Sequence, residues 1–586
     1  MNMDLGVQGL EAVKLAMGPP QHETTTKQHQ KFNSLPFEER VKFSTHERTR
    51  VNDVFRPVKI TAWFVLKAVL IKRLLVDNFV SNSKVAWVLV SLYFLNSWKA
   101  ERFPTDRLVS EVIPVQPFFG VLLGIAQHRN NLHGFVLDLL RHVKFQTIML
   151  PAPLTTSVVV MDARDREYVL KTNAQNYLKN FPDDSTSFEM VFAELLGRGI
   201  FATDQSEWLE SRKTASHMFT GHALAEQMER VFNLHADHVV ELLSKKTNGT
   251  VIDMQEVFQC AVFDAFCEIA FDHHANSVLS AVEGQKPGFL VSFDFCQGVA
   301  AERTATHPLA WMFSRLLGQG KEAEFKTHAQ AIDDYIYPLI RSRLAESDVS
   351  QRKDLLSLYI QNGRAHNQEL SEVELRDVIV NFMIAGRDTT SCLLTYSVKY
   401  LNENVDARQR LMDECLTGLF APVVTFESTK HVPFADAVVN EVLRLAPPVA
   451  NDFRMCIERD VLPSGQVVLP RSRMLLANQA IGRDPFLWAN PESFVPERWM
   501  RYDDDSSSGK RTALPVKRVD EYVHPVFFAG RRLCLGRDMA RYEAITFMTK
   551  LFTQLEITPL PNQSNATATG PVIFLKHGLK CTVELK

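Results

Sequence analysis

A cysteine near the C-terminal end of the chain, Cys534, lies in a segment whose residue types suit the binding of a flat ligand. The segment reads Phe527-Phe-Ala-Gly530-Arg-Arg532-Leu-Cys534-Leu-Gly536. Glycines on both sides of the thiol let the backbone come close to such a ligand. The neighbouring arginines and the N-terminus of the apolar helix predicted next favour a thiolate. A lone thiolate is a poor zinc site, which needs four ligands, but it is a good axial ligand for haem iron. The simpler alternative is a buried core cysteine beside arginines on a solvated face.

A second set of chemically capable residues lies inside the clearest long helix of the sequence, predicted over residues 371–398. Ser371 and Glu374 form a capping box at its start. An apolar stripe at helical spacing follows, and it is interrupted by Gly386, Asp388 and Thr389. Polar residues in a buried helix need a reason. From the residues alone, catalysis and a purely structural role, with a threonine bonded back to a carbonyl and a salt-bridged aspartate, are equally good explanations.

Two further pairs of residues share helix faces. Trp208 and Arg212 are four residues apart, and such a pair is commonly a surface cation–π contact. Glu441 and Arg444 are three residues apart, and such an ion pair is ordinarily worth a few tenths of a kcal/mol, roughly 0.2–0.5. Neither pair carries a function by itself.

Taken together, these segments resemble the cytochrome P-450 family. The Cys534 segment matches the family's haem-binding signature F-x-x-G-x-R-x-C-x-G, and the four elements occur in the family's order from about residue 110 to the end. The resemblance implies that Cys534 is the axial ligand of a haem (iron protoporphyrin IX). It also implies that Trp208, Arg212 and Arg454 reach the haem propionates. The remaining loop residues that would hold the cofactor are Phe527, Gly530, Arg532 and Gly536.

The same resemblance assigns roles to the other pairs. Gly386 would open a groove for dioxygen in the helix, and Asp388 and Thr389 would deliver protons during oxygen activation. Some animal relatives carry a glutamate before this glycine that is esterified to the haem. Ala385 stands there in this chain, so a non-covalent haem is expected. Structural support behind the haem loop would come from Glu441, Arg444 and Arg498.

The fold implied by the resemblance is mainly α with a small β region, a single cytochrome P-450 domain over residues 104–586. Residues 1–57 form a polar extension. Residues 58–103 contain two apolar runs, Ile60–Ile71 and Val85–Leu95, each shorter than the ~20 residues of a spanning helix. A membrane-anchor or interfacial region is expected there, and a pair of buried helices is the alternative. The acidic, serine-rich stretch 502–515 is expected to be a solvated loop.

Composition narrows the class of protein. The chain has 586 residues and a formal net charge of −3, so nothing favours nucleic-acid binding. Its eight cysteines are scattered without paired spacing, which indicates a reducing compartment and no disulfide framework. The expected location is the endoplasmic reticulum membrane, with the catalytic domain facing the cytosol.

The activity implied by the resemblance is a monooxygenase that inserts one oxygen atom of O2 into a C–H bond of a lipophilic substrate. The sequence contains no flavin domain, so electrons would come from NADPH through a separate flavin reductase, with cytochrome b5 as a second candidate donor. The segments 195–217, 375–391 and 574–579 resemble the fatty-acid ω-hydroxylases of plants and microbes. The apolar residues expected to line the pocket suit a long alkyl chain, and equally a sterol or terpenoid: Phe382, Val449, Phe453 and Phe574.

Two alternatives of other kinds remain open at this point. One is a family member that rearranges hydroperoxides without oxygen or a reductase, and the pair Asp388-Thr389 counts against it. The other is a non-catalytic haem-binding protein or sensor. The sequence does not identify a residue that would bind a fatty-acid carboxylate.

Overall fold

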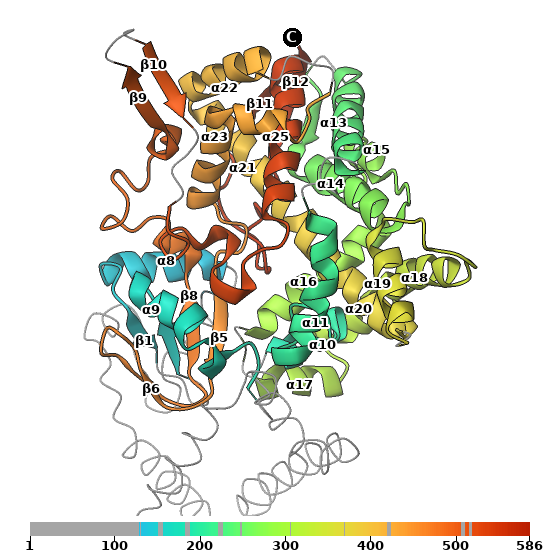
Figure 1. The fold of residues 1–586 in the computed structure, drawn as a ribbon, viewed down its shortest axis with the longest axis vertical. Helices are drawn as coiled ribbons and strands as arrows, with labels where there is room; N and C mark the ends of the chain where they lie inside the picture. The colour runs from blue at the N-terminus through green and yellow to red at the C-terminus, as the bar shows by residue number, and fades with distance from the viewer. Residues whose placement is uncertain are drawn as a thin grey trace, which may run out of the picture. The chain divides into compact units, whose positions relative to one another are not determined.

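The computed structural model describes residue 128 and residues 131–586, apart from ten short gaps (Figure 1). The gaps are residues 151–155, 182–187, 221–226, 247–248, 305, 307, 368–369, 419–422, 506–509 and 515–518. The polar extension and the anchor region expected at 1–103 lie outside the described residues. Within the described part of the chain, no helix combines the length and apolar character needed to cross a membrane.

The described residues belong to one compact unit that is mainly helical, with small sheets at its side, which confirms the predicted fold class. Figure 1 shows the strands β1, β5 and β8 gathered at one side, the β9–β10 hairpin projecting at another edge, and β11 and β12 among the helices. In chain order the helices are α8 (Leu132–His142), α9 (Ala163–Glu167), α10 (Phe188–Leu196), α11 (Gln205–Ser216), α13 (Glu229–Ser244), α14 (Met254–Phe271), α15 (Ser277–Val282), α16 (Gly288–Thr304), α17 (Pro308–Leu316), α18 (Gly320–Leu344), α19 (Leu355–Ala365), α20 (Glu372–Met383), α21 (Thr389–Glu403), α22 (Val405–Gly418), α23 (Pro433–Leu445), α24 (Asn478–Ile481) and α25 (Arg537–Gln554).

The long helix predicted at 371–398 exists and extends to Glu403, but it has three parts. The capping box of Ser371 and Glu374 starts α20, as predicted. A π-helical turn, η7 (Ile384–Asp388), then interrupts the α-helical hydrogen bonding before α21 begins. Such π-turns are single-turn insertions that are often found at functional sites. The turn coincides with the glycine and the aspartate singled out in the sequence.

Helix α14 packs against this long helix, and nearly all of its residues are buried. Its buried residues include polar ones such as Asp264 and Glu268, so α14 is a core helix with some polar contacts in the interior. Helix α14 contacts both η7 and α21, and α25 contacts α21 as well. The π-turn therefore packs directly against α14, and α25 packs against the helix that follows the turn.

The sheets are small. Five strands pair in the order β1-β2-β8-β5-β3, and only the β2–β8 pair is parallel. A second sheet has the order β11-β12-β4, and two hairpins, β6–β7 and β9–β10, stand apart. The strands are β1 (Ile148–Leu150), β2 (Ser157–Val159), β3 (Tyr177–Leu178), β4 (Val251–Asp253), β5 (Asp452–Cys456), β6 (Asp460–Val461), β7 (Val467–Val468), β8 (Arg473–Leu476), β9 (Arg501–Asp505), β10 (Lys510–Leu514), β11 (Leu555–Pro559) and β12 (Lys580–Leu585).

The prediction of a solvated loop at 502–515 was wrong, because β9 and β10 form an antiparallel hairpin there. The register sets Lys510 opposite Asp505 and Arg511 opposite Asp504. The loop prediction considered only the polarity of the stretch, and polarity alone does not exclude a two-stranded hairpin.

One buried carboxyl stands out in the core. Glu543 on α25 is 2% exposed and neighbours Thr390 at the start of α21. Burial raises the pKa of Glu543 to about 8, and a hydrogen bond with Thr390 opposes part of that shift. The side chain is therefore neutral at pH 7 and acts as a polar member of the helix interface.

We expect Glu543 to make stability depend on pH. The folded protein keeps a proton that the unfolded chain loses near pH 4.3. Stability should therefore fall as the pH rises from about 4 to about 8, by at most about 1.4 kcal/mol per pH unit. Glu543→Gln should remove this slope, measured as the melting temperature between pH 6 and pH 9, whereas Glu403→Gln on the exposed end of α21 should keep it. Parallel curves for wild type and Glu543→Gln would contradict the assignment.

Candidate active site

The loop that carries Cys534 is shaped by backbone conformations that the predicted glycine permits. Gly530 has φ +66°, and a Cβ at this position would lie 2.4 Å from the carbonyl oxygen of Leu170. A larger residue would therefore be strained and would clash with the backbone. The Cys534 N–H donates to the Phe527 carbonyl at 2.8 Å and closes the loop. Helix α25 starts directly afterwards, with Gly536 as its N-cap residue.

Cys534 is the one exposed cysteine, and the other seven are buried. Its surroundings are nevertheless dense enough that burial raises the pKa of the Cys534 thiol. The Gly536 N–H and the charges of Arg212 and Arg537 lower that pKa, as the sequence suggested, but burial outweighs them. A sulfur that is open on one side and enclosed on the others is suited to a ligand that covers it.

Trp208 organises the cations beside this loop. The guanidinium of Arg532 lies 4.6 Å from the centre of the Trp208 ring, and that of Arg212 lies 5.6 Å from it. Arg212 also donates to the carbonyl of Leu533, the residue before the cysteine, at 2.7 Å. Trp208 and Arg212, which the resemblance assigns to the cofactor, thus lie beside the Cys534 loop, and Trp208 is only 7% exposed rather than part of a surface pair.

Arg454 and a lysine that the sequence analysis missed, Lys179, complete a cationic cluster with Arg212 and Arg532. Lys179 pairs with Asp452 at 3.2 Å, and Arg454 pairs with the same carboxylate at 3.2 Å. Arg532 pairs with Asp204 at 2.7 Å. Nothing in the local sequence of Lys179 marks it, because its partners lie far along the chain.

The cationic cluster sets four cations against two carboxylates, so it carries an excess of two positive charges. Burial and the charge of Arg454 lower the pKa of Arg532 to about 10. Burial lowers the pKa of Lys179 to about 8, although Asp452 opposes this. Uncompensated buried cations are unfavourable unless an anion neutralises them. Two carboxylates, such as the two propionates of haem, fit this cluster in number and in sign.

The oxygen-activation motif combines both explanations that the sequence left open. Thr389 Oγ1 donates to the carbonyl of Ala385 at 2.6 Å, and Asp388 pairs with Arg387 at 2.9 Å. These are the contacts of the structural explanation. The π-turn, however, is a local departure from α-helix at the position where the resemblance expects a groove. Gly386 itself faces α14, where a Cβ would lie 2.7 Å from the ring of Phe266.

Burial raises the pKa of Asp388 to about 6. An acid with a pKa near the working pH is suited to passing protons. Asp388 can therefore exchange a proton near neutral pH even though it is paired with Arg387.

The structural trio Glu441, Arg444 and Arg498 is brought together. Arg444 binds Glu441 through two nitrogens at 2.8 and 2.9 Å, and Arg498 reaches the same carboxylate at 3.1 Å. Trp499, which the sequence analysis did not single out, adds an indole N–H at 2.8 Å. Glu441 and Arg444 are fully buried, so this network is part of the core.

The four predicted pocket residues do not form one group. Phe382 stacks on Phe219 with ring centres 6.3 Å apart, and Phe453 contacts Phe188 at 5.8 Å. Val449 is 37% exposed. Phe574 lines a different space, a cavity of about 400 Å³ whose walls combine polar and apolar residues. The sequence analysis missed Phe188 and Phe219, which belong to helices whose apolar residues gave no sign of a shared wall.

An exposed cysteine sulfur, a cluster with two excess positive charges and a π-turn with a buried acid define a haem-thiolate oxygenase site. Among the described residues, no group of three or more His, Cys, Asp or Glu side chains offers another metal site. The chain belongs to the cytochrome P450 family, whose model matches residues 112–584.

Curated relatives agree over most of their length. The chain is 28% identical to cytochrome P450 94B1 of Arabidopsis thaliana over 497 residues, which cover 82% of this chain and 94% of the relative. It is 29% identical to cytochrome P450 94B3 of the same plant over 510 residues, 85% and 96% of the two chains. Cytochrome P450 704B1, also from Arabidopsis thaliana, is 26% identical over 544 residues, 85% and 98%.

The protein is therefore a haem-thiolate monooxygenase that takes electrons from a redox partner and acts on a lipophilic substrate. When bound, the haem supplies oxygen binding and the oxidation of a C–H bond. Cys534 would ligate its iron, and the cationic cluster would hold its propionates. Asp388 and Thr389, on the long helix, would provide protons.

We expect Cys534→Ser to abolish the strongly red-shifted absorption band of the reduced, carbon monoxide-bound protein, because a hydroxyl cannot replace the thiolate ligand. The control is Cys456→Ser. The Cys456 thiol donates to the carbonyl of Glu458 at 2.9 Å and accepts from Asn176 Nδ2 at 3.9 Å, and a serine hydroxyl offers the same donor and acceptor. A red-shifted band that survives in Cys534→Ser would contradict the assignment.

We also expect Glu441→Ala to lose bound haem and about 3–5 kcal/mol of unfolding free energy, because it leaves buried Arg444 without its partner. Urea unfolding and the haem content of the purified protein measure both effects. The matched control is Glu497→Ala, which removes an exposed pair with Arg410 and should cost at most about 1 kcal/mol. Equal losses in the two variants would show that burial of the network is not what matters.

Proposed function

We propose that this monooxygenase hydroxylates long-chain fatty acids at or near the ω end. The observation that carries the proposal is a contact between two segments that resemble fatty-acid ω-hydroxylases, 195–217 and 375–391. The stretch 195–201 lies on α20 and is fixed there by side chains of α20. Asn381 donates to the Leu196 carbonyl at 2.8 Å and accepts from the Phe201 N–H at 3.0 Å.

Two glycines make this contact possible. A Cβ at Gly197 would lie 1.9 Å from Asp377, and a Cβ at Gly199 would lie 2.0 Å from Asn381. Asp377 in turn accepts from the Arg198 N–H at 2.8 Å. The sequence Gly-Arg-Gly is thus required for the close contact with α20. This requirement supports an architecture shared with the branch that the segment resembles.

Aromatic side chains support an alkyl substrate. Phe188 stacks on Phe192 at 4.5 Å and lies 5.8 Å from Phe453, so α10 and β5 share an aromatic cluster. Phe219 and Phe382 form a second pair between η5 (His217–Phe219) and α20. Pockets lined by aromatic side chains bind a chain of methylene groups without polar contacts.

The partner and location follow from the same proposal. Electrons would come from NADPH through a flavin reductase, with cytochrome b5 as a second donor. Residues 58–103 would attach the protein to the endoplasmic reticulum membrane, with the catalytic domain in the cytosol. Sedimentation of the full chain, compared with a chain that begins at residue 104, tests the attachment.

We expect saturated fatty acids of 12 to 18 carbons to shift the haem from low to high spin, because the chain displaces water near the iron. With reductase and NADPH, they should give products hydroxylated at or near the terminal carbon, identified by mass spectrometry. Omission of the reductase or of NADPH should abolish the products.

Sterols and terpenoids are the comparison set for the same assay. Turnover of these compounds with no response to fatty acids would overturn the fatty-acid assignment and leave the monooxygenase in place. Conversion of lipid hydroperoxides without NADPH would indicate a rearranging enzyme. A haem-loaded protein without turnover of any of these lipids would favour a non-catalytic role.

A further inference from the structure

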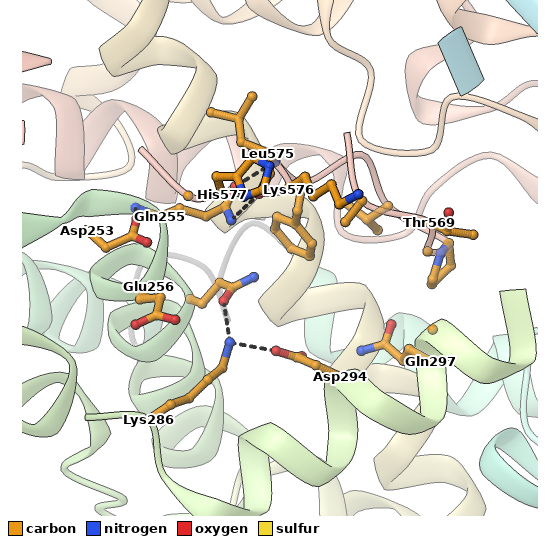
Figure 2. Close-up of a pocket in the computed structure, with 18 of the residues that line it drawn as sticks. Asp253, Gln255, Glu256, Lys286, Asp294, Gln297, Thr569, Leu575, Lys576 and His577 are labelled. Atoms are coloured by element: carbon orange, nitrogen blue, oxygen red, sulfur yellow. Dashed lines mark hydrogen bonds and ion pairs between the residues drawn. The ribbon is translucent and has the colours of Figure 1, made fainter. Parts of the chain in front are cut away.

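A polar cavity of about 400 Å³ lies between α14, α16 and the segment 568–580 (Figure 2). Figure 2 shows the side chain of Lys286 pointing across it toward Asp294, with Gln297 further along α16. A cavity of this size with polar walls can hold several water molecules. Four of the polar residues that line it are Gln259, Lys286, Asp294 and Gln297.

A chain of ion pairs runs from this cavity to the oxygen-activation motif. Lys286 Nζ lies 2.7 Å from Asp294 Oδ2, and Asp294 Oδ1 lies 2.6 Å from Arg387 Nη1. The same nitrogen of Arg387 lies 2.9 Å from Asp388 Oδ1. The Asp294 side chain is 31% exposed, whereas those of Arg387 and Asp388 are 0% exposed. This chain of ion pairs therefore leads from the polar cavity into the closed core, and it contains only two carboxylates, Asp294 and Asp388.

Arg387 is shared between Asp294 and Asp388. This arrangement leaves hydrogen-bonding atoms of both Arg387 and Asp388 without a partner in the described part of the chain. Asp388 Oδ2 and Arg387 Nε have no hydrogen-bond partner of ordinary length among the described residues. Gln297 lines the polar cavity and also lies close enough to Asp388 to favour its ionised form. A buried oxygen without a partner, next to a polar cavity, is a place where a water molecule would complete the hydrogen bonding.

The two carboxyls differ in their affinity for a proton. Burial raises the pKa of Asp388 to about 6, against the charge of Arg387 and with the help of the Asp294 charge. Burial also acts on Asp294, but Arg387 and Lys286 outweigh it, so the pKa of Asp294 is lowered. The inner carboxyl can therefore exchange a proton near neutral pH while the outer one stays ionised.

The other titratable groups near this pair stay neutral. Burial raises the pKa of Cys260 on α14 to about 11. Burial also raises the pKa of Cys392 on α21 well above its ordinary value. The charges that face Asp388 are thus those of Arg387, Asp294 and Lys286.

We propose that the polar cavity is the proton entrance to Asp388, and that Asp294 is a positioning residue that keeps Arg387 divided between two carboxylates. Insertion of one oxygen atom of O2 into a C–H bond consumes two electrons and two protons, and the second oxygen atom leaves as water. Cavity water would protonate Asp388 at Oδ2, and Asp388 would pass the proton to the Thr389 side of the π-turn. Arg387 cannot carry the proton itself, because a guanidinium does not deprotonate in proteins. The inference rests on the family's oxygen chemistry and not on fatty acids as the substrate.

The first test is an infrared titration of the full-length haem protein, which needs no substrate. The protonated Asp388 carboxyl band is assigned by its loss in Asp388→Asn. Asp294→Asn removes the like charge and leaves Arg387 to Asp388 alone, so the band should titrate about one pH unit lower than in wild type. That shift is about a tenfold loss of the acid form at a fixed pH. The control is Glu256→Gln, a carboxyl on α14 that lines the same cavity and should leave the titration unchanged.

The second test measures coupling, the ratio of hydroxylated product to NADPH consumed, with any substrate that shifts the spin state. Coupling should fall as the pH rises, because Asp388 loses its proton. In Asp294→Asn this decline should begin about one pH unit lower, with hydrogen peroxide in place of the missing product. Glu256→Gln should follow wild type. An Asp294→Asn protein whose infrared titration and coupling profile both match those of wild type would overturn the proposal.

A second variant keeps the proposal testable if Asp294→Asn fails to bind haem. Gln297→Leu leaves every ion pair in place and makes the inner wall of the polar cavity apolar. We expect coupling to fall several-fold and the solvent deuterium isotope effect to increase, with a normal reduced carbon monoxide spectrum. Normal coupling and an unchanged isotope effect in Gln297→Leu would exclude the polar cavity as the entrance.

Discussion

A fully buried carboxylate, that of Glu441, holds together the part of the molecule on which the haem loop depends. It accepts hydrogen bonds from Arg444, from Arg498 and from the indole of Trp499. Through Arg444 the network also binds the backbone carbonyls of Pro491 and Ser493 at 2.6 and 2.9 Å. A buried charge is tolerated only when all its partners are in place. Trp499, which this network holds, lies with its ring centre 4.5 Å from that of His524, so the network supports the segment that precedes the Cys534 loop.

The haem site shows the opposite use of charge. Its cationic cluster has two positive charges in excess. The lowered pKa values of Arg532 and Lys179 show that burial makes these charges unfavourable. The folded chain alone does not compensate this charge, so binding of a dianionic cofactor gains electrostatic energy that a balanced cluster would not offer. Stability and cofactor binding are coupled for this reason. The cationic cluster also holds the Cys534 loop directly, because Arg212 donates to the carbonyl of Leu533.

The long helix shows how a structural and a chemical role occupy the same residues. Thr389 and Asp388 both make the contacts expected of a helix that simply satisfies its polar groups. The π-turn nevertheless places an acid with a pKa of about 6 at the centre of the fold. What separates the two roles is the environment beyond the helix, where Asp294 competes for Arg387 and a polar cavity lies within reach.

The sequence by itself determined the features that depend on local spacing. The Cys534 loop, the capping box at Ser371 and the order of the motifs identified the fold and the class of chemistry, because each is encoded within a few neighbouring residues. The tertiary structure decided the charge balance at the haem site and the surroundings of Asp388. Lys179 and Asp452 are far apart in the sequence, as are Asp294 and Arg387. The spacing of residues along the chain does not predict ion pairs of this kind. Only the packing of distant elements brings their charges together, and the resulting burial sets their protonation.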